Sequence, residues 1–302
     1  MSVAREAAES FDWSEVASLR IRSRLVAEGV YAGAHRSARR GSGIEFGGHR
    51  EYVAGDDLRW LDRRALLRHG RLLVRQFETE TDRALRLVVD ASASMGYRGE
   101  KRAHDSKLGT ASLLSAVLAR IAVASGDPVG LTYFGGEHAR PVAVAGGREG
   151  FERVLGSLEA VRAGGDAVRD PALLDRALGI LSRAARRGSV VVVMSDLFDM
   201  PEDAPERFAA LASRGRSVVV VQILDPDELD LPFEGTVRLR AIEGDALVET
   251  NAEDARAAYR TALDELASRY EGTLVARGAR FVRASTGDDP ANVVRAIIAT
   301  VR

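Results

Sequence analysis

The fold is decided by Leu85-Arg-Leu-Val-Val-Asp90-Ala-Ser92-Ala-Ser94, an apolar run of strand length followed by a turn with one carboxylate and two hydroxyls. In open α/β sheets, ligands bind at the carboxyl ends of the strands, where loops project from a rigid scaffold. Oxygen groups at positions i, i+2 and i+4 of such a turn can point to one spot. That spot would suit a hard divalent cation such as Mg²⁺.

Downstream of this turn, apolar runs alternate with helical patterns to the end of the chain. Continuous apolar strands of this kind are typical of a parallel sheet with both faces covered. The sequence therefore predicts an α/β fold with a doubly wound, mostly parallel, Rossmann-like sheet. The predicted strands are 85–90, 129–134, 189–194, 217–224 and 280–285, and the predicted helices are 107–124, 148–161, 203–213, 253–270 and two that begin at Asp170-Pro171 and Asp289-Pro290.

Two regions depart from this alternation. Residues 1–82 predict an N-terminal segment of mixed short helix and strand, with a helix at 12–29 ended by Gly29, a short helix at Leu58–Leu67 and a strand at Arg71–Glu80. Residues 225–250 predict a small β insertion with strands at 236–242 and 245–250. We therefore divide the chain into an N-terminal segment, 1–82, and a sheet domain, 83–302.

Composition excludes several classes of function. The chain has no Cys, which removes disulfides, thiolate catalysis and Cys-based metal sites, and its five His include no His-x-x-x-His pair. The formal net charge is −1, so no overall field favours nucleic acid or an acidic membrane. The first ten residues lack the apolar core of a signal peptide, and we expect no membrane span. A cytoplasmic location is the default expectation.

A second strand end also carries an acid. Asp196 follows the predicted strand 189–194, and the carboxyl ends of neighbouring strands can bring Asp90 and Asp196 together. A single Asp after a strand is often only a turn residue or a helix cap, and this alternative stays open for Asp196. Three such residues at alternate positions exceed what a turn needs, so Asp90, Ser92 and Ser94 favour a functional site.

Asp90-Ala-Ser-Ala-Ser94 resembles the metal-ion-dependent adhesion site (MIDAS) of von Willebrand factor A domains. The resemblance implies that Ser92 and Ser94 bind Mg²⁺, Mn²⁺ or Ca²⁺ directly, and that the aspartates act largely through water. In that fold, a Thr from a second loop and an Asp at the end of a later strand complete the set. Asp196 matches the last position.

The upstream stretch contains the motifs Gly43-x-Glu45-Phe46, Arg50-Glu51-Tyr52, Gly55-Asp56-Asp57-x-Arg59-x-x-Asp62, Gly70-Arg71, Val74-Arg75 and Phe77-Glu78. With these motifs it resembles the bacterial family called domain of unknown function fifty-eight, whose A-like domain follows such a segment directly. The resemblance runs from about residue 41 to the end of the chain. Two departures stand out: Arg63 replaces the usual Trp, and the second loop, 162–170, has no Thr. Asp166 and Asp170 are its nearest oxygen donors, although Asp170 also suits a helix cap.

The resemblance implies a non-enzymatic protein-interaction module. Proteins of this kind are commonly encoded with MoxR-type AAA+ ATPases, so the resemblance implies an adaptor or co-chaperone of such an ATPase. The expected partner is the ATPase or its client, bound through an acidic residue. A metal-dependent, phosphatase-like hydrolase is one alternative, but haloacid-dehalogenase-like phosphatases need a second carboxylate where this chain has Ser92. A structural interaction domain with a degenerate site that binds no metal is another.

Arginines between Arg36 and Arg75 are interleaved with acids, so we expect ion pairs with the sheet domain and no nucleic-acid binding. His104 lies close in sequence to the turn at residues 90–94, within a charged stretch. We therefore expect it to be a surface histidine.

Overall fold

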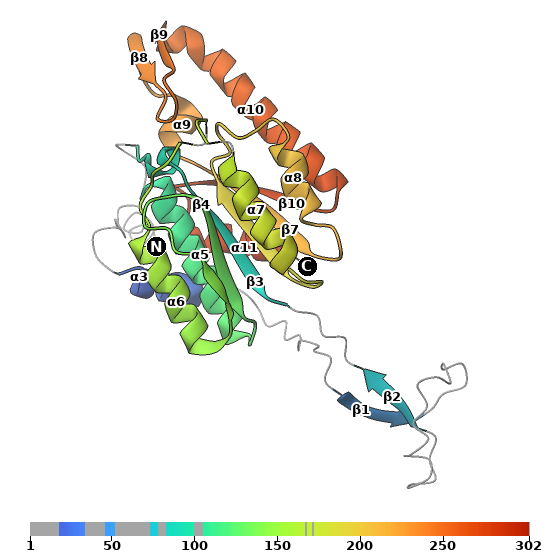
Figure 1. Cartoon of the computed structure of the whole chain (residues 1–302). Helices are drawn as coiled ribbons and strands as arrows, with labels where there is room; N and C mark the ends of the chain where they lie inside the picture. The colour runs from blue at the N-terminus through green and yellow to red at the C-terminus, as the bar shows by residue number, and fades with distance from the viewer. Residues whose placement is uncertain are drawn as a thin grey trace.

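A six-stranded sheet forms the centre of the computed structural model, which describes residues 18–33, 46–51, 73–77, 83–99, 105–166, 168–170 and 172–301 (Figure 1). The strand order is β10-β7-β6-β3-β4-β5, and every neighbouring pair is parallel except β4 and β5. The predicted α/β fold with a mostly parallel sheet is therefore confirmed. The strands are β3 (Leu85–Ala91), β4 (Val129–Gly135), β5 (Val142–Ala145), β6 (Val190–Ser195), β7 (Ser217–Leu224) and β10 (Arg280–Ser285).

The order of the strands places a switch in winding direction at β3. The chain runs from β3 to β4 on one side and later resumes with β6 on the other side of β3. In open α/β sheets, a crevice forms outside the carboxyl ends of the two strands where the winding reverses. Here those ends carry Asp90 and Asp196, so the topology alone brings the two acids together at the carboxyl ends of β3 and β6.

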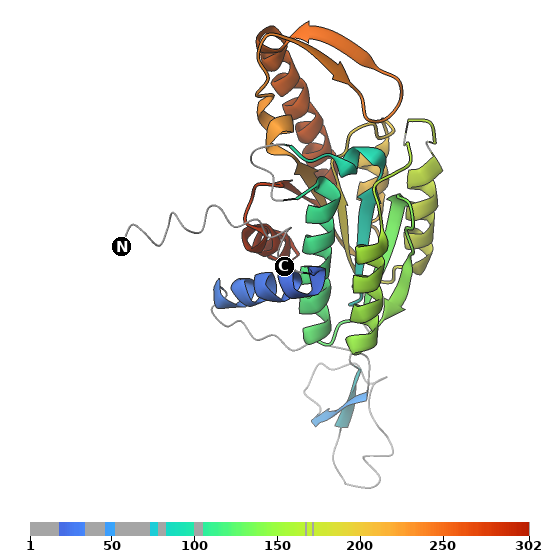
Figure 2. The same ribbon diagram turned by 90° about the vertical axis from the view of Figure 1, so that its left-hand side faces the viewer.

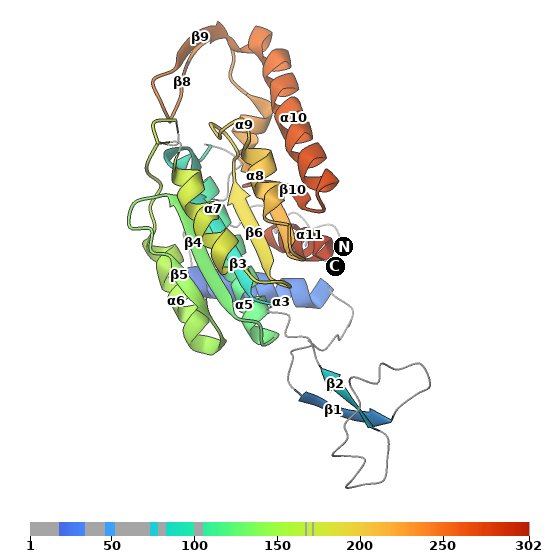
Figure 3. The ribbon, with the colours of Figure 1, turned by 45° about the vertical axis from the view of Figure 1, so that its right-hand side comes forward.

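Side chains of the central strands alternate between two hydrophobic cores, as the two-residue period of a strand requires. Leu87 and Val89 lie in one core and Val88 in the other. Figure 3 shows α7, α8 and α10 on the near face of the sheet. The first core is covered by α3 (Leu19–Gly33), α5 (Lys107–Ala124), α6 (Gly147–Ala160) and α11 (Pro290–Thr300), and the second by α7 (Ala172–Ala184), α8 (Ala204–Ala210) and α10 (Ala252–Ala276).

Helix α3 packs across α5 and α11, as Figure 2 shows. The prediction that Gly29 ends this helix is wrong, because α3 continues to Gly33. The continuation buries Val30 in the first core, while the Gly29 carbonyl accepts a hydrogen bond from Arg295. Tertiary packing therefore outweighs the poor helix propensity of glycine. Residues 12–17 of the predicted helix lie outside the described residues.

Two small antiparallel pairs complete the fold. β1 (Phe46–Glu51) pairs with β2 (Leu73–Phe77), which falls inside the strand predicted at 71–80; β1 was not predicted, and the helix expected at 58–67 lies outside the described residues. β8 (Thr236–Arg240) pairs with β9 (Leu247–Asn251), as expected for the insertion. The insertion also contains a short helix, α9 (Pro226–Asp230), which the sequence analysis missed.

Two buried tyrosines make a matched test of the cores. Tyr270 is fully buried between Phe208 and Phe281, and its hydroxyl has no hydrogen-bond partner among the described residues. The Tyr133 hydroxyl lies 3.0 Å from the Ser157 hydroxyl. We expect Tyr270→Phe to leave the free energy of unfolding unchanged or raise it by about 1 kcal/mol, because it removes an unpaired buried group. Tyr133→Phe should lower it by about 1 kcal/mol.

Urea denaturation of the two variants beside the wild type would measure both effects. Equal losses in the two variants would contradict the assignment.

Candidate site at the carboxyl ends of β3 and β6

Asp90 is the last polar residue of β3, and its side chain is completely buried. One carboxyl oxygen accepts the backbone N–H of Ser92 at 2.9 Å, and the other accepts the hydroxyl of Ser195 at 2.6 Å. Burial, followed by the nearby charge of Asp196, raises the pKa of Asp90 to about 7. Asp90 therefore holds the turn and the end of β6 together, and its charge changes near neutral pH.

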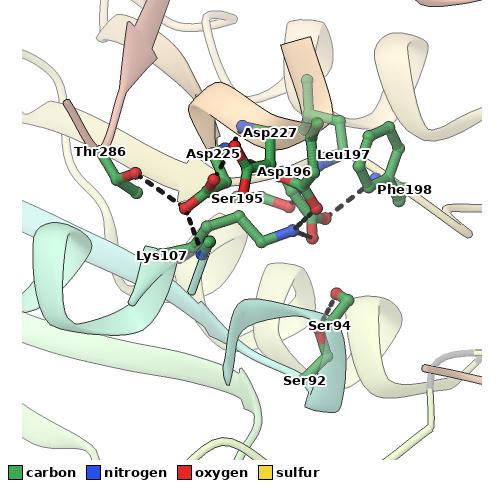
Figure 4. Close-up of polar contacts among 12 residues, drawn as sticks. Ser92, Ser94, Lys107, Ser195, Asp196, Leu197, Phe198, Asp225, Asp227 and Thr286 are labelled. Carbon is green, nitrogen blue, oxygen red and sulfur yellow. Dashed lines mark hydrogen bonds and ion pairs between the residues drawn. The ribbon is translucent and has the colours of Figure 1, made fainter. Parts of the chain in front are cut away.

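The serine turn, residues 90–94, leads into a short 3₁₀ helix, η2 (Ala93–Gly96). The hydroxyl oxygens of Ser92 and Ser94 lie 3.2 Å apart, and both residues are buried (Figure 4). The second loop packs directly on this turn: the N–H of Ala93 donates to the Gly165 carbonyl, and the N–H of Gly164 donates to the Ala91 carbonyl. The two hydroxyls thus converge as the motif predicts.

Asp196 lies immediately after β6 and is also completely buried. Its Oδ2 atom accepts a hydrogen bond from the ammonium group of Lys107 at 2.8 Å, and its Oδ1 atom accepts the backbone N–H of Phe198 at 3.0 Å (Figure 4). A fixed positive charge of the chain itself therefore neutralises Asp196.

Lys107 is the first residue of α5 and has no solvent exposure. Its ammonium group also contacts Glu228 Oε1 at 2.5 Å, and it lies 5.2 Å from the centre of the Phe198 ring. Burial alone would lower the pKa of Lys107, but the charges of Asp196 and Glu228 outweigh that effect and raise the pKa. The lysine is therefore held in its charged form between two carboxylates.

Glu228 has a second role as the third residue of α9. Its other carboxylate oxygen accepts the backbone N–H of Asp225, and the Asp225 side chain caps the helix in return. This capping box fixes the direction of the short helix. The ion pair with Lys107 therefore connects α9, α5 and the end of β6.

The loop after β6 has a strained backbone. Leu197 and Asp199 have φ angles of 66° and 53°, in the left-handed region that non-glycine residues rarely adopt. Hydrogen bonds compensate, because the Leu197 N–H donates to the Ser195 hydroxyl at 2.9 Å. Strain of this kind is concentrated at functional sites, where the surroundings over-determine the backbone.

A carboxylate from the β8–β9 turn covers the serine turn. Glu243 is almost fully buried, and its Oε1 atom accepts the backbone N–H of Ser94 at 2.9 Å. Asp166 holds the hairpin in place, because its carboxylate accepts the N–H of Gly244 at 2.9 Å. The Nη2 atom of Arg169 donates to both carboxylate oxygens of Asp245, which adds a second link. Figure 2 shows the hairpin extending from the start of α10 across this edge of the sheet.

Asp170 lies apart from these contacts. Its half-exposed side chain pairs with Arg176 at 2.6 Å, and this hydrogen bond lowers its pKa. A further hydrogen bond from the backbone of Ala172, at the start of α7, agrees with the predicted helix cap. The structure thus gathers Asp90, Ser92, Ser94 and Asp196 at one edge, with Asp166 under the hairpin. Their role as metal ligands stays a prediction.

Sequence reasoning missed Lys107, Ser195, Glu228 and Glu243. Lys107 had a usable signal, because it is one of only two lysines in a chain that otherwise uses arginine. A lysine ammonium is a compact point charge with three donors, and here it lies between two carboxylates. Glu243 had none, since 149 positions separate it from Ser94.

Acidic and His side chains do not form a metal site on their own. Within the described ranges, no group of three or more of them is arranged to hold a metal ion.

The family model "Protein of unknown function DUF58" matches residues 48–269. The chain belongs to this family. The resemblance read from the Gly-Asp-Asp block and the serine turn is confirmed.

The chain is also similar to other proteins and solved structures. The uncharacterized protein Mb1516 of Mycobacterium bovis is 28% identical over 228 residues, which cover 76% of this chain and 70% of the relative. BatB from Bacteroides thetaiotaomicron is similar with a TM-score of 0.48 and 20% identity, over 72% of this chain and 98% of that one. A von Willebrand factor type A structure from Catenulispora acidiphila has a TM-score of 0.40 and 12% identity, over 74% and 43% of the two chains.

The predicted cytoplasmic location is corrected. One similar structure, from Bacteroides fragilis, is described as an aerotolerance-related membrane protein; it has a TM-score of 0.46 and 18% identity over 72% of this chain and 98% of that one. The expectation of a cytoplasmic location is therefore withdrawn. Among the described residues, α5 alone is long and apolar enough to cross a membrane, and most of that helix is buried in the sheet domain.

The raised pKa of Asp90 predicts a pH dependence of stability. The folded form binds this proton more tightly than the unfolded chain, where the pKa is about 4, so the wild type should lose stability as pH rises from about 4 to about 7. The loss should be on the order of a few kcal/mol. Asp90→Asn should lack this component. Denaturation of both proteins between pH 4 and 8 measures it, and a constant difference between them would contradict the prediction.

Gly135 allows the serine turn to lie close to β4. Its φ is +72°, and a Cβ atom there would lie 2.8 Å from the backbone nitrogen of Ser92. Gly135→Ala should therefore lower the free energy of unfolding by about 3 kcal/mol or more. Gly126→Ala is the matched control, because Gly126 has a φ of +87° and open space around it; its cost should be about 1 kcal/mol. Equal losses would contradict the close approach.

Proposed function

We propose that this chain is a non-enzymatic protein-interaction module that binds an acidic side chain at the serine turn. The observation that carries the proposal is the carboxylate of Glu243 on the backbone N–H of Ser94. The turn already accommodates one carboxylate, so its shape and its donor suit another. Membership of the DUF58 family and the A-like fold fit a protein-interaction module.

Glu243 then competes with the partner. It comes from the same chain, is buried, and is held by the contacts of Asp166 and Arg169 with the neighbouring residues Gly244 and Asp245. An incoming acidic side chain must displace it or bind beside it. Like charges at close range oppose the second route unless a cation lies between them.

We further propose that Mg²⁺ supplies that cation when a partner binds. Ser92 and Ser94 would hold it through their hydroxyl oxygens, with Asp90 and Asp196 contributing negative charge. A bound Mg²⁺ would draw the partner carboxylate to its open coordination position. Lys107 opposes cation binding, because it already neutralises Asp196. We therefore expect weak Mg²⁺ binding in the absence of a partner.

The proposed partner is a MoxR-type AAA+ ATPase or its client. The proposal rests on the family to which the chain belongs and on the acid-binding chemistry of the turn.

Calorimetry with Mg²⁺ tests the cation. Ser92→Ala with Ser94→Ala should abolish binding, because it removes both hydroxyl ligands. Lys107→Met should tighten binding about tenfold or more, because Asp196 and Glu228 lose their counter-charge. Ser125→Ala, at the exposed far end of α5, is the control. Absence of binding in the wild type and in Lys107→Met would sink the cation proposal.

Binding of the MoxR-type ATPase from the same host tests the interaction itself. Immobilised wild-type chain should retain the ATPase more strongly with Mg²⁺ than with a chelator, and the double serine variant should not. Glu243→Gln should strengthen binding several-fold, because the amide competes less well for the turn. Equal retention by wild type and double serine variant would contradict the proposed surface.

A further inference from the structure

An arginine-lined cavity of about 1280 Å³ opens at the amino ends of the strands, at the opposite end of the sheet from the serine turn. It lies between the ends of α7 and α8 and the starts of β6 and β7. Six arginines line it against a single acid, although the chain as a whole has a formal charge of −1. The arginine cavity comprises Arg183, Arg186, Arg187, Arg207, Arg214 and Arg216, with Asp175 as the acid.

The acid of the cavity is already engaged. Asp175 pairs with Arg207, which also pairs with Asp203 at 2.7 Å. Among the described residues, the other exposed arginines of the cavity, Arg183, Arg186, Arg187 and Arg214, form no ion pair. Their charges therefore add to one another without compensation from the protein.

Arg216 forms the inner wall of this cavity. It is only 8% exposed, its Nη2 atom donates to the Ser182 carbonyl at 3.0 Å, and its Nε–H has no acceptor among the described residues. Burial, and then the charge of Arg214, lowers its pKa. A buried donor without an acceptor is costly, so a site that supplies an acceptor from outside the protein would gain stability.

Capping of helix ends accounts for only part of this arrangement. Arginines near the carboxyl ends of α7 and α8 offset the negative ends of the helix dipoles. Arg86 caps Ala184 and Arg216 caps Ser182 in this way. Among the described residues, the four exposed arginines make no such hydrogen bond to a helix carbonyl, and capping does not require the unpaired Nε–H of Arg216.

We propose that the arginine cavity binds a phosphate-bearing anion. Guanidinium groups match phosphate oxygens in a two-pronged geometry and stay charged at all physiological pH values. The volume exceeds that of a bare ion, so the cavity has room for a ligand with a body beyond its phosphate. The same chemistry is offered by a soluble phosphate compound and by the headgroup of an anionic phospholipid.

Pyrophosphate titration and vesicle sedimentation test the cavity on the full chain. The vesicles contain phosphatidylcholine alone or mixed with phosphatidylglycerol. Whichever probe binds the wild type, pyrophosphate or phosphatidylglycerol vesicles, should bind at least tenfold more weakly to the double variant Arg186→Ala with Arg187→Ala. Arg238→Ala with Arg240→Ala on exposed β8 removes the same charge elsewhere and should change binding less than twofold. Thermal unfolding verifies that both variants are folded.

Each outcome either distinguishes a soluble phosphate compound from a phospholipid headgroup or contradicts the proposal. Pyrophosphate binding without vesicle binding assigns a soluble phosphate compound, and binding to phosphatidylglycerol vesicles alone assigns a lipid headgroup. The proposal fails if the wild type binds neither probe, if both double variants lose affinity equally, or if hexaglutamate binds more tightly than pyrophosphate. The double serine variant should bind as the wild type does, so the result is independent of the function proposed for the serine turn.

Discussion

The contact of Lys107 with Asp196 and Glu228 is the constraint on which the site depends. An ammonium with no solvent exposure is tolerated only where opposite charges and hydrogen bonds replace its water. Because Lys107 begins α5, the contact fixes the start of the core helix over the carboxyl edge of the sheet. Its backbone N–H also donates to the Tyr97 carbonyl, which closes the loop that follows the serine turn. One side chain thus sets the positions of β6, α9 and the serine turn.

The same contact divides the charges of the site unevenly. Lys107 compensates Asp196, while the hydrogen bonds that Asp90 accepts from described residues come from neutral groups, namely the backbone and side chain of Ser92 and the hydroxyl of Ser195. Burial therefore favours the protonated form of Asp90, and the ionised neighbour Asp196 adds to that preference. The two aspartates have different roles: Asp196 forms an ion pair with Lys107, and Asp90 is a titratable link between β3 and β6. Their shared sequence signature, an acid at a strand end, does not reveal this difference.

Local pattern was enough to predict the sheet and the edge that holds the acids. Apolar runs set the strands, and strand ends place Asp90 and Asp196 at the winding switch. The predictions that failed depend on contacts between residues far apart in the sequence. Gly29 stays helical because Val30 packs in the core, and Glu243 reaches Ser94 only through the β8–β9 hairpin. Lys107 lay between these cases, since its rarity was visible but its partners were not. The cytoplasmic expectation failed because composition says little about what a domain is attached to.

The two ends of the parallel sheet carry opposite charges, and the reason lies in the direction of the strands and helices. Parallel strands bring all carboxyl ends to one edge, where loops with Asp90, Asp196 and Glu243 meet, and all amino ends to the other. Helices run antiparallel to the strands, so α7 and α8 end at the second edge with their negative dipole ends, which favours arginine there. Surplus arginines such as Arg186 and Arg187 then make that edge strongly basic. Because the edges lie at opposite ends of the strands, an acidic partner at the serine turn and an anion in the arginine cavity would not compete for space.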